Sequence, residues 1–163
     1  MPAVALNFQF ADYQTEQGEQ ARAWRAAVDL RFPVATGGEL PCLCMIDSGA
    51  PFSVLPHSLW SGGRLAWTRW GTHLLTASGR RLARALTWQG LPCALGAIEV
   101  DLVDANIRAG PFVVVAKFVE SVHSNPAMEN LALLGLNFVM DNGLRLEMDA
   151  YGDAPSGHLE WPD

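Results

Sequence analysis

The stretch 42-CLCMIDSGAPFSVLP-56 consists of an apolar run, an acid, a tight turn and a second apolar run. The acid is Asp47, and the turn is Ser48-Gly49-Ala50. A carboxylate at the end of a core strand is costly unless N–H groups or hydroxyls donate to it. Gly49 lets the backbone approach closely and adopt dihedral angles that other residues avoid. We therefore expect a strand that ends at Asp47 and a loop that presents this acid at a fixed angle.

The composition of the chain is that of one globular domain. It has 163 residues, of which 50% are hydrophobic and 17% are charged, enough for a sizeable core. The net charge of -6 argues against a nucleic-acid partner, since such domains usually carry a basic face. No apolar run reaches the length of a membrane span, and the N-terminus lacks the basic start of a signal peptide. We expect a cytoplasmic protein without a membrane partner.

The three cysteines, Cys42, Cys44 and Cys93, do not make a disulfide framework, because their number is odd. Cys42 and Cys44 lie two positions apart on a predicted strand and so share one face. A metal site there would need two further ligands, and the four histidines show no ligand spacing. We expect buried free thiols, a reducing compartment, and neither a metal nor another cofactor.

Apolar and polar residues alternate along most of the chain, which is typical of half-buried strands. Many short strands at close spacing predict an all-β fold, a single-lobe barrel or sandwich with one short C-terminal helix. We expect one domain over 1–163, with its core at about 22–149 and a flexible tail at 150–163. The expected elements are strands at 4–10, 24–32, a segment ending at 47, 72–76, 81–88, 98–102, 112–118, 131–134 and 144–148, helical turns at 56–60 and 136–140, and loops at 11–20 and 119–130.

Two motifs give the chain a resemblance to a known family. Asp47-Ser48-Gly49-Ala50, followed by Ser53, resembles the catalytic loop of the retropepsins, the retroviral-type aspartic proteases. Leu133-Leu134-Gly135 resembles the family's hydrophobic-hydrophobic-Gly segment, which precedes a short helix and packs behind the catalytic loop. Two motifs in the right order are more specific than either alone. The resemblance covers about residues 22–149 and implies a closed β-barrel of the retropepsin type and an aspartic endopeptidase activity.

The resemblance also implies two carboxylates that share one proton, one acting as base and the other as acid. Asp141-Asn142-Gly143 is another Asp-x-Gly after an apolar run, but it lacks the Ser or Thr and is predicted to be a turn. We expect the second acid to be Asp47 of another copy, because a twofold interface brings equivalent residues face to face. The chain is thus expected to form a homodimer. By resemblance Ser48 interlocks with the same residue of the second copy, while Ser53 is placed to hydrogen-bond within the loop.

A protease of this kind needs a hairpin, the flap, that closes over an extended protein or peptide substrate. Two turns could form its tip, Ala77-Ser78-Gly79-Arg80 and Gln89-Gly90-Leu91-Pro92. We favour the first, because Ser-Gly between strand-like arms is a plain hairpin signal. The region is longer than in the viral enzymes and lacks their several glycines. Core packing is predicted for the tryptophans here, with cleft lining as the alternative: Trp60, Trp67, Trp70 and Trp88.

Two other functions stay open on the sequence. A dimeric binding or interaction module could keep the same fold without proteolysis, because a fold alone does not fix a function. The domain could also process only its own precursor or a single partner. The intact Asp47, Ser48 and Gly49 favour the endopeptidase.

Overall fold

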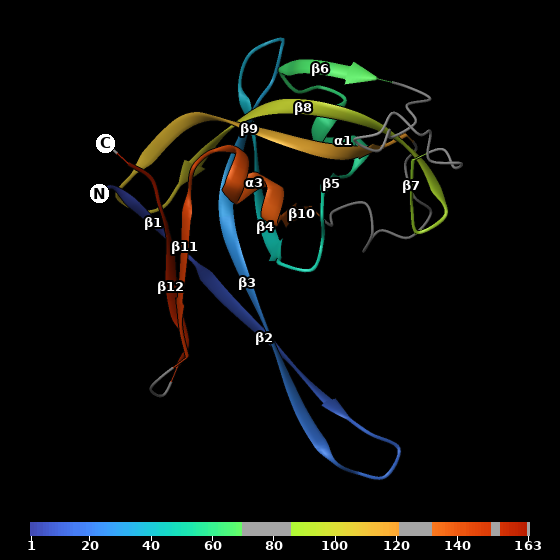
Figure 1. The fold of residues 1–163 in the computed structure, drawn as a ribbon, viewed down its shortest axis with the longest axis vertical. Helices are drawn as coiled ribbons and strands as arrows, with labels where there is room; N and C mark the ends of the chain where they lie inside the picture. Colours follow the sequence, from blue (N-terminus) through green and yellow to red (C-terminus); the bar gives the residue numbers. More distant parts are fainter. Residues whose placement is uncertain (70–85, 121–131, 151–153, 163) are drawn as a thin grey trace, which may run out of the picture.

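The computed structural model describes residues 1–69, 86–120, 132–150 and 154–162, and strands dominate them (Figure 1). This confirms the all-β prediction. The described helices are α1 (His57–Trp60) and α3 (Leu136–Asp141), close to the predicted helical turns. The strands are β1 (Ala3–Ala5), β2 (Asn7–Gln14), β3 (Gln20–Pro33), β4 (Glu39–Asp47), β5 (Ser53–Leu55), β6 (Leu65–Arg69), β7 (Thr87–Trp88), β8 (Leu91–Val103), β9 (Arg108–Val119), β10 (Leu133–Gly135), β11 (Arg145–Asp149) and β12 (Ser156–Glu160).

The strands form two sheets. The smaller one has the order β1-β12-β11, and the larger one runs β2-β3-β4-β10-β5-β9-β8-β6, with β7 paired to β8. Neighbours are antiparallel except that β10 runs parallel to β4, and β5 parallel to β9. β3 also pairs with β8, through Leu30↔Leu102 and Arg31↔Asp101, which brings distant members of the larger sheet together. The strand predicted at 72–76 lies outside the described residues.

Side chains from both sheets and both helices share one apolar core. Among the largest fully buried ones are Phe32, Phe118 and Phe138. The indole of Trp60 stacks on Phe118 with ring centroids 5.3 Å apart, and its Nε1–H donates to the carbonyl of Val119 at 2.9 Å. The core role predicted for Trp60 is therefore confirmed, because both its apolar ring and its polar atom are satisfied inside the fold.

The predicted loop at 11–20 is wrong, because these residues belong to a long hairpin. β2 and β3 pair without interruption from Asn7↔Ala27 to Gln14↔Gln20. Its outer part is exposed on both faces, so the sequence lacks the apolar alternation that marks a half-buried strand. The hairpin extends away from the rest of the fold at the bottom of Figure 1.

The flexible tail predicted at 150–163 is contradicted by β12. This strand lies between β1 and β11, and its Leu159 is fully buried opposite Val4 and Leu146. The Gly, Pro and charged residues of the segment suggested a frayed end. A single well-placed leucine and two neighbouring strands are enough to order Ser156–Glu160 instead.

The three cysteines are free thiols. Cys44 and Cys93 are buried, whereas Cys42 is partly exposed. Burial raises the pKa of the Cys44 thiol well above its usual value and that of Cys93 to a smaller extent. In the described ranges, α1 and α3 included, no helix has the length and apolar character to cross a membrane.

Candidate active site

Asp47 is the last residue of β4, and its side chain is exposed. Its Oδ1 accepts the backbone N–H of Gly49 at 3.0 Å, and its carbonyl accepts the N–H of Ala50 at 3.1 Å. These two bonds close a tight turn on the acid itself. The loop therefore fixes the direction of one carboxyl oxygen and leaves the group open to solvent.

Gly135 lies directly behind this loop. β10 inserts between β4 and β5, and the parallel register places Gly135 opposite Asp47. A Cβ atom at Gly135 would lie 2.6 Å from the carbonyl oxygen of Ala50 and 2.9 Å from the carbonyl carbon of Phe52. Glycine is required because any side chain would push the loop away from the strand.

A buried polar network ties the loop to α3. The Ser53 hydroxyl donates to Asn137 Oδ1 at 3.1 Å and accepts the N–H of Gly135 at 3.1 Å. The backbone N–H of Ser53 also donates to Asn137 Oδ1, at 2.9 Å, and Asn137 Nδ2 donates to the carbonyl of Val115 at 2.7 Å. The network connects β5, β9, β10 and α3, and each donor named here has an acceptor. Such a satisfied network rigidifies the structure around it.

A cavity of about 480 Å³ opens beside Asp47. It is bounded by β3, β4, the turn, β10 and β11, and its lining residues are Trp24, Arg25, Ala26, Met45, Ile46, Asp47, Ser48, Leu133 and Met148. Among the described residues of this lining, Asp47 is the one carboxylate. Met148 and Trp24 leave 56% and 46% of their surface exposed. In the described part of the chain, Asp47 thus shares its cavity mainly with apolar side chains, two of which are about half exposed.

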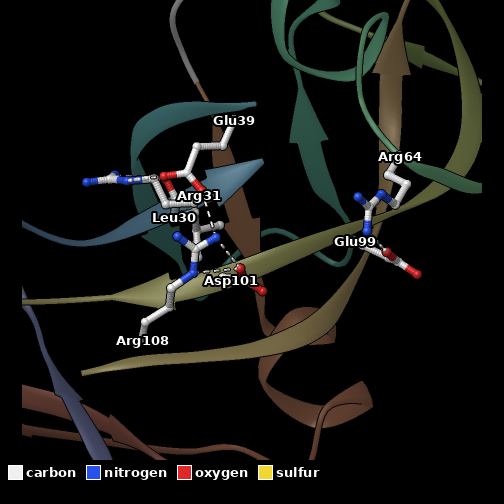
Figure 2. A network of polar contacts seen from close by, with 7 residues as sticks. All are labelled: Leu30, Arg31, Glu39, Arg64, Glu99, Asp101 and Arg108. Atoms are coloured by element: carbon white, nitrogen blue, oxygen red, sulfur yellow. Dashed lines mark hydrogen bonds and ion pairs between the residues drawn. The ribbon is translucent and has the colours of Figure 1, made fainter. Parts of the chain in front are cut away.

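The other acids singled out in the sequence have different roles. Asp101 accepts bonds from Arg108 Nε and Nη2 at 3.0 and 2.7 Å, and Arg108 Nη2 also lies 2.7 Å from Glu39 Oε2 (Figure 2). The Asp101 side chain is held in this ion pair and is only 17% exposed. Figure 2 shows the group on β3, β4, β8 and β9, and the cavity beside Asp47 has none of these residues in its lining.

The Asp141-Asn142-Gly143 segment forms the turn that was predicted. Asp141 ends α3 and is exposed, and Gly143 has a φ of 63°. The Asn142 amide holds the edge of β9: its Nδ2 donates to the Val113 carbonyl at 2.8 Å, and its Oδ1 accepts the Val113 N–H at 2.9 Å. The segment therefore anchors α3.

One group among the described residues could hold a metal, namely Glu147, His158 and Glu160 on β11 and β12. His158 Nε2 lies 2.7 Å from Glu160 Oε1 and 3.4 Å from Glu147 Oε2. Both carboxylates also face Arg145. The carboxylates are thus engaged by Arg145 and His158, and the group lies on β11 and β12, outside the lining of the cavity beside Asp47.

Sequence reasoning missed several residues of this site. Asn137 left a signal, because it is a polar residue inside the apolar run of α3. No sequence signal marks Trp24 or Met148 as site residues, because only the fold brings β3 and β11 to the same cavity. The predicted flap tip, Ala77-Ser78-Gly79-Arg80, lies outside the described residues.

In the comparisons with known proteins, no family model, no curated protein and no solved structure matches this chain.

Proposed function

We propose that the chain is an aspartic endopeptidase of the retropepsin type, in which two copies each contribute Asp47 to one site. The observation that carries the proposal is the exposed Asp47 carboxylate, the one acid among the described residues that line a largely apolar cavity. Its loop is braced from behind by Gly135 and by the Ser53–Asn137 network. A fold that only needed a turn here would not require a buried polar brace beneath an exposed acid.

The retropepsin-type fold is part of the proposal. It is supported by β10 lying parallel to the strand that ends in the acid, with α3 following immediately. It is also supported by the pairing of β3 with both β4 and β8, as a closed sheet would require. The segment Leu133–Gly135 contacts the acid loop through Ala50, which suits the buttressing role that the resemblance implies.

The chemistry follows from two like charges held close together. Both carboxylates cannot ionise at short distance, so the pair keeps one proton and titrates as a unit. The ionised member takes a proton from a water molecule, which attacks the peptide carbonyl, while the protonated member donates to the carbonyl oxygen. Return of the proton to the leaving amine breaks the peptide bond. Fixing Asp47 Oδ1 through the Gly49 N–H reduces the reorganisation that this exchange would need.

A twofold axis beside Asp47 supplies the second acid. The exposed Asp47 and the half-exposed Trp24 and Met148 beside it can meet the same surface of another copy, as an isologous interface requires. Each monomer alone would then hold half of a catalytic pair and cleave nothing.

The test compares wild type with Asp47→Asn. Peptide cleavage across acid to neutral pH should be lost in the variant by at least about 10³-fold, because the amide cannot act as base or acid. Asp141→Asn is the matched control, an exposed acid that ends α3, and it should cleave like wild type.

Equal cleavage by wild type and Asp47→Asn would overturn the catalytic assignment. A stable dimer without any Asp47-dependent cleavage of peptides would instead favour the dimeric interaction module. Cleavage confined to the chain's own precursor or to one partner would identify a self-processing or dedicated enzyme.

A further inference from the structure

The smaller sheet gathers charged side chains on one of its faces (Figure 1). In the β11–β12 pair, Glu147 lies opposite His158 and Arg145 lies opposite Glu160. Residues two positions apart on a strand share a face, so these four side chains point to the same side. Leu159, between His158 and Glu160, points to the other side and is fully buried in the core. The charged face is therefore the one that is turned away from the core.

Three of these side chains bring metal-ligand atoms together. Nε2 of His158 lies 2.7 Å from Oε1 of Glu160 and 3.4 Å from Oε2 of Glu147, and the three residues offer ligand atoms that all lie within 4.8 Å of one another. Zinc binds nitrogen and oxygen ligands at about 2.0–2.2 Å, which sets the ligand atoms of a tetrahedral site about 3.3 Å apart. The separation of His158 from Glu147 fits this geometry, and that of His158 from Glu160 needs only a small side-chain rotation.

One oxygen of Glu160 is left without a hydrogen bond. Oε2 is buried, no donor among the described residues reaches it, and Nη1 of Arg145 lies 3.7 Å away. A buried carboxylate oxygen without a donor is costly. Such an atom in a native structure calls for an explanation, and an ion or an ordered water molecule at that place is one of the usual ones. This oxygen is a second sign, beside the spacing of the ligand atoms, that the group takes a cation.

Arg145 faces both acids at present, and it is weakly held. It forms ion pairs with Glu147 and Glu160, and its side chain is 64% exposed. Exposed ion pairs contribute little, because water screens them and a long side chain must be held in one geometry. One guanidinium also carries only one positive charge against two carboxylates. A divalent cation can therefore displace the Arg145 side chain into solvent.

The ring of His158 can exchange a proton for a metal ion. Nε2 lies 2.7 Å from the Glu160 carboxylate, which accepts the proton that Nε2 carries. When a neutral ring carries its proton on Nδ1 instead, Nε2 presents a lone pair, and a metal ion takes the place of the proton between the two residues. A nitrogen ligand favours zinc over calcium and magnesium, which prefer oxygen ligands alone.

Small residues of β1 leave room beside these ligands. Ala3 lies opposite Glu160, and Ala5 lies opposite His158. Both alanines line a cavity of about 960 Å³, whose lining also includes Glu147 and His158. A hydrated ion can therefore reach the ligands from this cavity, and a water molecule can keep the fourth position of a tetrahedral ion.

We propose that Glu147, His158 and Glu160 form a zinc site that ties β11 to β12, with its fourth position open to water. The ligands come from two strands, so the spacing of histidines along the sequence does not reveal them. The three ligands lie outside the lining of the cavity beside Asp47. The zinc site is therefore independent of the proposed function, and the absence of peptide cleavage would leave it standing.

The experiment titrates zinc chloride into the metal-free full chain at neutral pH and follows the heat of binding. One zinc ion should bind per chain with a dissociation constant of about 10 μM or tighter, and calcium should bind at least about a hundredfold more weakly. The melting temperature should rise with zinc concentration, because an ion bound by the folded chain stabilises it. Failure of the wild-type chain to bind zinc overturns the proposal.

Ligand variants test which residues hold the ion. His158→Ala and Glu160→Gln should each weaken zinc binding at least about tenfold. The matched control is His57→Ala, a partly exposed histidine whose ring packs against Trp60, and it should change the dissociation constant less than about twofold. Circular dichroism checks that each variant keeps its strands. Zinc binding that survives both ligand variants overturns the site, and so does a loss of binding in Cys42→Ser, which would assign the ion to the thiols.

Arg145→Gln separates a zinc site from a plain ion-pair network. Removing the competing cation should tighten zinc binding at least about threefold, because the two carboxylates are then free of their ion pairs. An unchanged or weaker dissociation constant overturns the displacement of Arg145, and with it the site. Binding by the variant alone would show that Arg145 blocks the ion in the natural chain, which also overturns the proposal.

Discussion

Ser53 shows how one hydroxyl can hold a candidate site together. It is fully buried, and it is the buried polar residue of the described core. Its oxygen both donates to Asn137 and accepts from the Gly135 N–H, so removing it leaves the buried Gly135 N–H without its acceptor and takes one of two donors from Asn137 Oδ1. Unsatisfied buried groups cost more than the bond that is lost.

We therefore expect Ser53→Ala to lower the free energy of unfolding by about 2–3 kcal/mol. Urea unfolding followed by circular dichroism measures this value. Ser61→Ala, at the exposed C-terminal end of α1, is the control and should stay within about 0.5 kcal/mol of wild type. Equal losses in the two variants would show that the network does not stabilise the loop.

Among the elements, the connection between β8 and β9 depends on a single carboxylate. Asp104 Oδ1 accepts the N–H groups of Asn106 and Ile107 at 2.7 and 2.9 Å, and Oδ2 accepts that of Ala5 at 3.2 Å. The Asn106 bond contributes most to lowering the pKa of Asp104, burial opposes it, and the bonds from Ala5 and Ile107 lower the pKa further. This one side chain therefore joins the turn to β1.

Because the pKa of Asp104 is lower in the folded chain, its stabilisation is present above the unfolded value of about 3.9 and is lost as pH falls through the folded value. Asp104→Asn should cost about 1 kcal/mol at neutral pH, a modest figure because water screens the partly exposed group. The difference from wild type should shrink as pH is lowered below about 4. Urea titrations at several pH values measure it, and a gap that is constant with pH would contradict the linkage.

The errors at the level of elements share one physical cause. Periodicity finds strands that bury one face, and it succeeded for the strands predicted at 24–32 and 98–102, which lie within β3 and β8. It failed for the outer part of the β2–β3 hairpin, which buries neither face, and for Ser156–Glu160, where pairing with two neighbours overrides a weak local pattern. Asp47, Ser53 and Gly135 could be selected because each belongs to a short motif. The cavity wall could not, since β3 and β11 meet there only through the fold.

At the scale of the whole molecule, a shared pair of acids makes the activity of a dimer depend on whether both of its chains carry Asp47. Mixing equal amounts of wild type and Asp47→Asn, followed by subunit exchange, leaves about one quarter of the dimers with both acids. The total cleavage rate should then fall to about half of the rate that the same amount of wild type gives alone. The reason is that half of the wild-type chains are now in mixed dimers, which hold only one Asp47. An undiminished rate after complete exchange would show that each chain carries a whole site.

The parallel pairing of β10 with β4 also sets an order of events during synthesis. Residues 133–137, which brace the acid loop, follow Ser53 by eighty positions or more, and the Gly135 N–H reaches its acceptor Ser53 Oγ from a separation of 82 residues. A chain leaving the ribosome N-terminus first exposes Asp47 long before that brace exists. Contacts so distant in sequence also form slowly. On the proposed function, Asp47 therefore lacks its brace, and the nascent chain lacks a complete site, until residues 133–137 have been synthesised and have folded against the loop.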